Sequence, residues 1–98
     1  SPFLLYLPLT APHTPIAVAA EWQGKSSLNH PYADFVMQTD AAVGRVLDAV
    51  KAAGVEDNTL VVFTSDNGCA PYIGAKDLEA RGHFPSGPLR GYKADAWE

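Results

Sequence analysis

The sequence is poor in cysteine, in basic residues and in long apolar runs, and each shortage excludes a class of protein. The single cysteine, Cys69, cannot form an internal disulfide. The cysteine count therefore does not indicate whether the protein works in an oxidising or a reducing compartment. Seven basic residues against 11 acidic ones give a formal charge of −4, and no run of Lys or Arg occurs, which argues against nucleic acid as a partner. The longest apolar run, residues 3–9, is far shorter than the roughly 20 residues of a membrane span.

The composition that remains is typical of a globular fold. Hydrophobic residues make up 47% of the chain and charged residues 18%, so the chain is too apolar for a disordered tail. Eight glycines and eight prolines predict many turns. A length of 98 residues provides for one domain at most.

Two buried strands are predicted from continuous apolar runs. Residues 3–7 lie between two prolines and are predicted to form a strand that is buried on both faces. Such burial is typical of strands in parallel sheets. Residues 59–64 are rich in β-branched side chains and form a second run of this kind. The segment that follows Thr64 is rich in glycine and proline, and we expect a long irregular C-terminal region there, without a helix or a strand.

One long helix is predicted between these strands. Apolar residues recur at three and four residues from Tyr32 to Val50, Pro31 fits the first helical position, and Gly54 fits the residue just past the end. Its charged residues, Asp34 among them, are expected mostly in solvent. The order strand, helix, strand predicts an α/β fold with a βαβ unit, in which the crossover is right-handed and the strands are parallel.

Polar side chains follow the carboxyl ends of both predicted strands. In open α/β sheets, ligands bind just outside the carboxyl ends of the strands. His13 lies in the loop after the first strand, a loop that its prolines are expected to hold extended. Asp66 and Asn67 follow the second strand and supply two hard oxygens, which suit Ca²⁺ or Mg²⁺. On spacing alone Asp66-Asn67-Gly68 is more often a strand-ending turn, and His13 and Lys93 are more often structural or surface residues. Cys69 is interpreted as an ordinary thiol that is buried or half-buried.

Longer motifs add to this interpretation. The chain contains, in this order, the segments FLLYL (3–7), APHTP (11–15), VGRVL (43–47), DNTLVVFTSDNG (57–68), LRGYK (89–93) and WE (97–98). Together they resemble the arylsulfatase-type, formylglycine-dependent sulfatases over nearly the whole chain. The resemblance implies an alkaline-phosphatase-like α/β fold with a parallel or mixed sheet. Members of this family are several times longer, so residues 1–98 are interpreted as a single partial domain, an internal fragment of a sulfatase catalytic domain.

The resemblance also implies roles for four residues. Asp66 and Asn67 match the pair that coordinates the family's Ca²⁺, and the Asp is also held to help activate the formylglycine nucleophile. His13 matches a histidine that contacts the sulfate and assists departure of the alcohol. Lys93 matches a lysine that binds a sulfate oxygen and is a candidate proton donor. The formylglycine and the remaining Ca²⁺ ligands lie outside this chain, so the fragment is expected to be inactive alone.

By the same resemblance, the partner is a sulfate ester, either a small molecule or a sulfated glycan, and the remainder of the parent chain is required. Most members are exported or lysosomal, which implies a periplasmic, secreted or lysosomal parent. Two alternatives stay open: a fragment of a related phosphate or phosphonate ester hydrolase, and a non-catalytic binding piece. The context of His13 and Lys93 favours the sulfatase.

Overall fold

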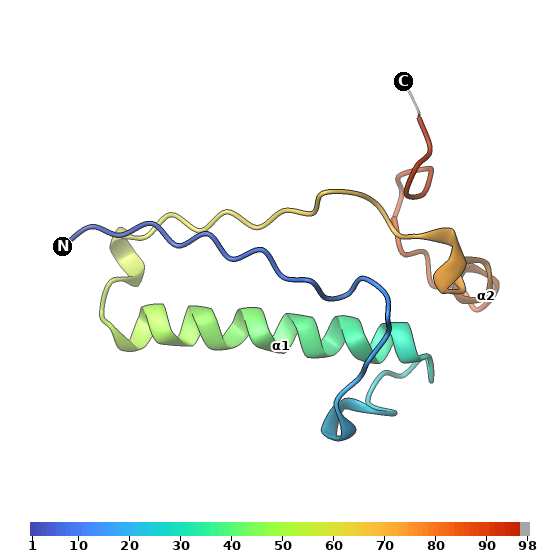
Figure 1. The fold of residues 1–98 in the computed structure, drawn as a ribbon, viewed down its shortest axis with the longest axis horizontal. Coiled ribbons are helices and arrows are strands. Elements are labelled where there is room, and N and C mark those ends of the chain that lie inside the picture. The colour runs from blue at the N-terminus through green and yellow to red at the C-terminus, as the bar shows by residue number, and fades with distance from the viewer. Residues whose placement is uncertain (97–98) are drawn as a thin grey trace. The chain divides into compact units, whose positions relative to one another are not determined.

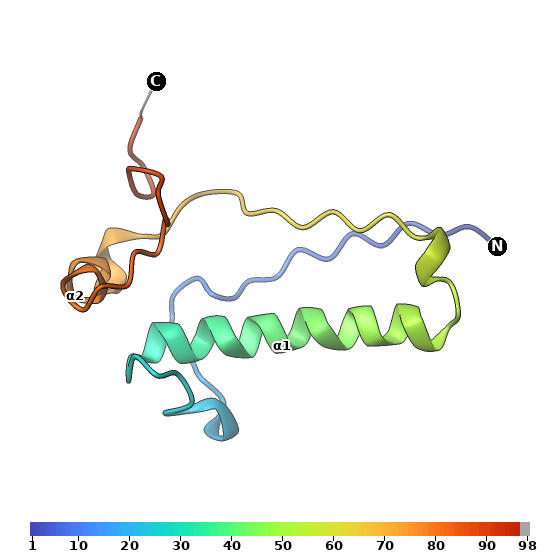
Figure 2. The same ribbon diagram turned by 180° about the vertical axis from the view of Figure 1, so that it is seen from behind.

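The computed structural model describes residues 1–96, and the chain divides after Thr59 into two compact units (Figure 1, and from behind in Figure 2). The first unit contains the 3-10 helix η1 (Ala20–Trp22), the helix α1 (Pro31–Ala52) and the 3-10 helix η2 (Glu56–Asn58). The second contains the 3-10 helix η3 (Pro71–Ile73) and the short helix α2 (Ala75–Ala80). None of the helices in the described part of the chain is both long and apolar enough to cross a membrane.

The two predicted strands are extended segments that belong to no sheet within residues 1–96. Figure 1 draws residues 3–7 and 60–64 as extended ribbon, Leu4 is 95% exposed and Leu60 is 89% exposed. A strand forms by a ladder of backbone hydrogen bonds to a neighbour, and neither segment has such bonds in the described residues. The predicted βαβ unit is therefore not formed here. The apolar composition identifies segments that favour burial, but it cannot supply the neighbouring strands that would pair with them.

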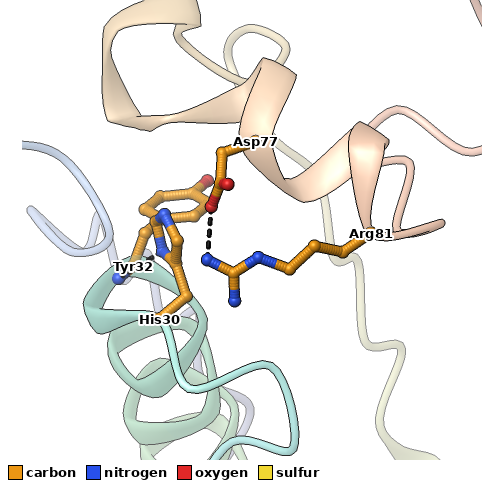
Figure 3. Close-up of polar contacts among 4 residues, drawn as sticks. All are labelled: His30, Tyr32, Asp77 and Arg81. Carbon is orange, nitrogen blue, oxygen red and sulfur yellow. Dashed lines mark hydrogen bonds and ion pairs between the residues drawn. The ribbon is translucent and has the colours of Figure 1, made fainter.

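The predicted helix is confirmed at both ends. Pro31 is its first residue, and the side chain of His30 caps it by accepting a hydrogen bond from Tyr32 N–H at 3.2 Å (Figure 3). The helix ends at Ala52, and Gly54 follows with a φ of +68°, a left-handed conformation that a residue without Cβ adopts without steric cost.

Asp34 corrects the prediction of a solvated charge. Its side chain is only 5% exposed, and its two carboxylate oxygens accept hydrogen bonds from Gly24 N–H at 2.8 Å and from Ser26 N–H at 2.7 Å. Hydrogen bonds from Ser26, and then from Gly24, hold the pKa of Asp34 below its ordinary value. One carboxylate thus fastens the loop that precedes α1 to the first turn of the helix. Helical spacing does not reveal this role because the loop itself supplies the donors.

A pH dependence follows from the lowered pKa of Asp34. The stability that the ionised carboxylate provides is present above the unfolded-state pKa, 3.8 in ordinary Asp, and is lost as the pH falls through the lower pKa of the folded state. In the intact protein, Asp34→Ala is expected to lower the melting temperature at pH 7, and this difference from the parent should shrink below about pH 4. Melting curves from pH 2 to pH 8 measure it. Asp40→Ala, an exposed site on α1, is the control, and a difference that does not change with pH would contradict the assignment.

The second unit contains a helix where none was predicted. α2 begins after Gly74, whose φ of 91° is left-handed, and it buries Ala75 and Leu78, the latter only 1% exposed. Asp77 and Arg81 form an ion pair one turn apart at its surface (Figure 3). The helix contains only six residues, which are too few to show helical periodicity among the surrounding glycines and prolines.

Candidate functional site

Asp66 and Asn67 lie in a bend directly after the extended segment 60–64. Ser65 Oγ donates to the carbonyl of Asn67 at 2.8 Å, and Asn67 Nδ2 donates to the carbonyl of Gly68 at 2.7 Å. These local bonds between side chains and backbone define the bend without help from a ladder. Both residues are exposed, so their side chains are accessible to a ligand.

The oxygen atoms at this bend fit a hard divalent cation. Because Nδ2 of Asn67 is used as a donor, its Oδ1 keeps its lone pairs for a ligand. Within the described residues, no group of three or more His, Cys, Asp or Glu side chains could hold a metal ion. Ca²⁺ takes six to eight oxygen ligands, so Asp66 and Asn67 can provide only part of such a site.

Lys93 is held against the segment that follows this bend. Its N–H donates to the carbonyl of Cys69 at 2.9 Å. A Cβ added to Gly68 would stand 3.9 Å from both Lys93 N and Tyr92 C, which is ordinary van der Waals contact. The structure therefore brings Lys93 to the chain segment that carries Asp66 and Asn67, although these residues are far apart in sequence. Cys69 itself is half-buried, as predicted.

His13 belongs to the first unit and Asp66 to the second, so the expectation that both residues serve one site stays a prediction. Its loop is not extended, because His13 N–H donates to the carbonyl of Thr10 at 3.1 Å and closes a turn. The prolines restrict the backbone but allow this turn. Nδ1 of His13 lies 2.8 Å from the carbonyl of Thr14. A carbonyl only accepts, so Nδ1 is the donor in this contact.

A hollow of about 220 Å³ lies in the second unit, with Tyr92 in its lining. Its lining comes from α2 and from the loop that returns to Lys93, namely Glu79, Phe84, Ser86, Gly87, Leu89, Arg90, Gly91 and Tyr92. The hydroxyl of Tyr92 donates to the carboxylate of Glu79, a contact that links the returning loop to the helix. No pattern in the sequence predicts this pair, apart from the position of Tyr92 directly before Lys93.

Comparisons with known proteins agree with the sequence motifs. A family model described as sulfatase matches residues 1–98. N-acetylgalactosamine-6-sulfatase of Rattus norvegicus is 38% identical over 87 residues, which cover 89% of this chain and 16% of that protein. N-acetylgalactosamine-6-O-sulfatase of Bacteroides thetaiotaomicron is 34% identical over 99% of this chain and 19% of its own length. Steryl-sulfatase of Rattus norvegicus is 39% identical over 100% of this chain and 17% of its own length. No solved structure matches the chain significantly.

The matches extend over the candidate site as well as the helices. This chain spans between 16% and 19% of the length of these three relatives. The family implies an alkaline-phosphatase-like α/β fold, which agrees with the α/β class predicted from the apolar runs, while residues 1–96 alone contain helices and extended segments. Trp97 and Glu98, which belong to the quoted motifs, lie outside the described residues. Because the family model covers the chain from end to end and relatives above 30% identity span nearly all of it, the chain belongs to the sulfatase family.

Proposed function

We propose that the protein to which this chain belongs hydrolyses sulfate monoesters, and that Asp66, Asn67, Lys93 and His13 serve that reaction. The hydrogen bond from Lys93 N–H to the carbonyl of Cys69 carries the proposal, since it draws a lysine to the segment that presents the two oxygen ligands. Membership of the sulfatase family supports the same reaction class. The relatives named above act on a sulfated amino sugar or on a steryl sulfate, so a sulfated glycan or a small sulfate ester is the proposed substrate class.

The proposed roles follow from the charge of a sulfate ester. Negative charge accumulates on the non-bridging oxygens and on the departing oxygen as the sulfur–oxygen bond breaks, and fixed positive groups stabilise it. The ammonium of Lys93 binds one of the non-bridging oxygens. A hydrogen on Nε2 of His13 would be donated to the departing oxygen, while Nδ1 stays engaged with the carbonyl of Thr14 so that the ring keeps one orientation.

Two groups that the family implies complete this chemistry. Asp66 and Asn67 would hold Ca²⁺, which when bound supplies a Lewis acid for sulfate oxygens. A formylglycine from outside this chain would supply the nucleophile. We therefore propose that residues 1–98 are an internal part of a longer catalytic domain and that this part alone releases no sulfate.

A comparison of three esters of one alcohol tests the proposed function. The intact protein is expected to hydrolyse 4-nitrophenyl sulfate at least about tenfold faster, in kcat/KM, than 4-nitrophenyl phosphate or a 4-nitrophenyl phosphonate. The purified 98-residue chain serves as the control and should show no turnover. A preference for the phosphate or phosphonate would favour the related ester hydrolase. If the intact protein is folded but hydrolyses none of the three esters, the result would favour the non-catalytic alternative.

A further inference from the structure

Tyr92 precedes Lys93 and is tied to helix α2 by its side chain. The phenolic hydroxyl donates a hydrogen bond to Oε1 of Glu79, 13 positions earlier in the chain. This bond to an anionic acceptor raises the pKa of Tyr92 above its ordinary value. The phenol therefore keeps its proton, and the donor role, throughout the neutral range.

Hydrogen bonds from three backbone N–H groups hold the turn that contains Lys93. Tyr92 N–H donates to Oδ2 of Asp95 at 2.8 Å, and Asp95 N–H donates to the carbonyl of Tyr92 at 3.0 Å. Lys93 N–H donates to the carbonyl of Cys69 at 2.9 Å. Among these contacts, the bond between phenol and carboxylate is the one that joins the turn to a helix.

Helix α2 is a firm anchor because packing fixes it. Ala75 is fully buried and Leu78 is 1% exposed, which makes them two of the three buried apolar side chains in the described residues. His83 N–H donates to the carbonyl of Leu78 at 2.9 Å and closes the end of the helix. Glu79 follows Leu78 directly, so its Cα is fixed by the best-packed part of the second unit.

We infer that Glu79 is a positioning residue that acts through the Tyr92 hydroxyl to hold Lys93 in place for a sulfate oxygen. The inference rests on the role proposed above for Lys93. A lysine side chain is long and rotatable, so its backbone must be fixed if the ammonium is to meet one oxygen atom of the substrate. A displacement of about 1 Å at a reacting centre costs up to about 100-fold in rate. A hydrogen bond that fixes the neighbouring residue therefore has a measurable effect on turnover.

A competing explanation is that Glu79 acts on Lys93 directly through its charge. The two explanations differ for Glu79→Gln, which keeps an oxygen that accepts from Tyr92 but removes the negative charge. They also differ for Tyr92→Phe, which removes the hydroxyl, keeps the ring, and leaves the charge of Glu79 unchanged.

The experiment uses the intact protein, a sulfate ester substrate and four variants. Glu79→Ala and Tyr92→Phe are each expected to lower kcat by about tenfold with KM within about threefold, because the positioned charge matters most in the transition state. Glu79→Ala/Tyr92→Phe is expected to lose no more than either single variant, since both break one contact. Glu79→Gln is expected to keep most of the parent kcat.

Two matched controls accompany these variants. Tyr72→Phe removes the hydroxyl of an exposed tyrosine in η3, and Asp77→Asn removes a carboxylate from the exposed face of α2. Both should retain the parent kcat. Rates are divided by the folded fraction from circular dichroism, so a loss of stability alone leaves the corrected kcat unchanged. If Glu79→Ala does not fold, Tyr92→Phe decides, because it removes a single oxygen atom.

The inference is overturned if Tyr92→Phe retains the parent kcat, if the two single effects multiply in the double variant, or if Glu79→Gln loses as much as Glu79→Ala. The variant Lys93→Ala distinguishes these outcomes from a failure of the proposed function. If Lys93→Ala itself leaves kcat unchanged, the role of Lys93 is wrong and the inference fails with it. If Lys93→Ala lowers kcat but Tyr92→Phe does not, only the positioning role is wrong.

Discussion

Asp66→Ala in the intact protein is expected to lower kcat for a sulfate ester by about 10³ and to abolish saturable Ca²⁺ binding. The alanine removes one of the two proposed Ca²⁺ ligands of this chain. A Lewis acid contributes several kcal/mol of transition-state stabilisation, and each 1.36 kcal/mol is a factor of ten in rate. Steady-state kinetics at several Ca²⁺ concentrations measure the first effect. Isothermal titration calorimetry with CaCl₂ measures the second. Asn67→Ala should weaken Ca²⁺ binding less, because an amide oxygen carries no formal charge.

The chain offers a matched control for Asp66. Asp57 and Asn58 form a second Asp-Asn pair, exposed in η2, so Asp57→Ala removes the same side chain from the same dipeptide. This variant should retain the parent kcat and Ca²⁺ affinity. Equal effects of Asp57→Ala and Asp66→Ala would show that the loss is a general response to charge removal. An unchanged Ca²⁺ affinity in Asp66→Ala would refute the proposed ligand.

Lys93→Ala is expected to lower kcat by about 10² to 10³, the loss typical of removing one preorganised donor to a developing anion. Lys93→Arg should recover only part of this loss, since a planar guanidinium occupies more space and presents its donors in a different direction. Lys76→Ala removes an exposed lysine from α2 and should have no effect. Steady-state kinetics on the purified, folded variants give these values.

A series of aryl sulfates separates the two roles proposed for Lys93. If Lys93 only binds a non-bridging oxygen, Lys93→Ala should slow all members of the series by a similar factor. If it also donates the proton, the loss should grow as the leaving phenol becomes less acidic, because a poor leaving group depends more on protonation. A kcat that equals the parent value across the series would contradict both roles.

The sequence predicted α1 well because its signals are local. A proline at the first position and a glycine after the end each act within one turn of the helix boundary. The sequence did not reveal that the two extended segments lack partner strands. Residues 3–7 have the composition of a buried strand, but pairing depends on neighbouring strands, which composition does not describe. Helix α2 escaped prediction for the opposite reason: it is stabilised by burial of Leu78 rather than by a long periodic pattern.

The sequence proposes the residue types of the candidate site and only part of its geometry. Asp66 and Asn67 are proposed from their place after an apolar run, and Lys93 is proposed from the motif around it. The contact between Lys93 and Cys69, and the pairing of Tyr92 with Glu79, join residues separated by a glycine-rich loop, so no spacing rule reveals them. Asp34 shows the same limit, since its partners lie in an irregular segment.

The bond between Lys93 and Cys69 also makes residues 70–92 a loop with a fixed base. The entropy cost of closing a loop rises only logarithmically with length, so doubling such a loop costs about 0.6 kcal/mol. At Gly87 an added Cβ would meet no atom within 4 Å, which leaves open space for an insertion. An insertion at the turn near Gly87 is therefore expected to leave the bond between Lys93 and Cys69 and the bond between Tyr92 and Glu79 in place, so the loop can be lengthened there without displacing its ends.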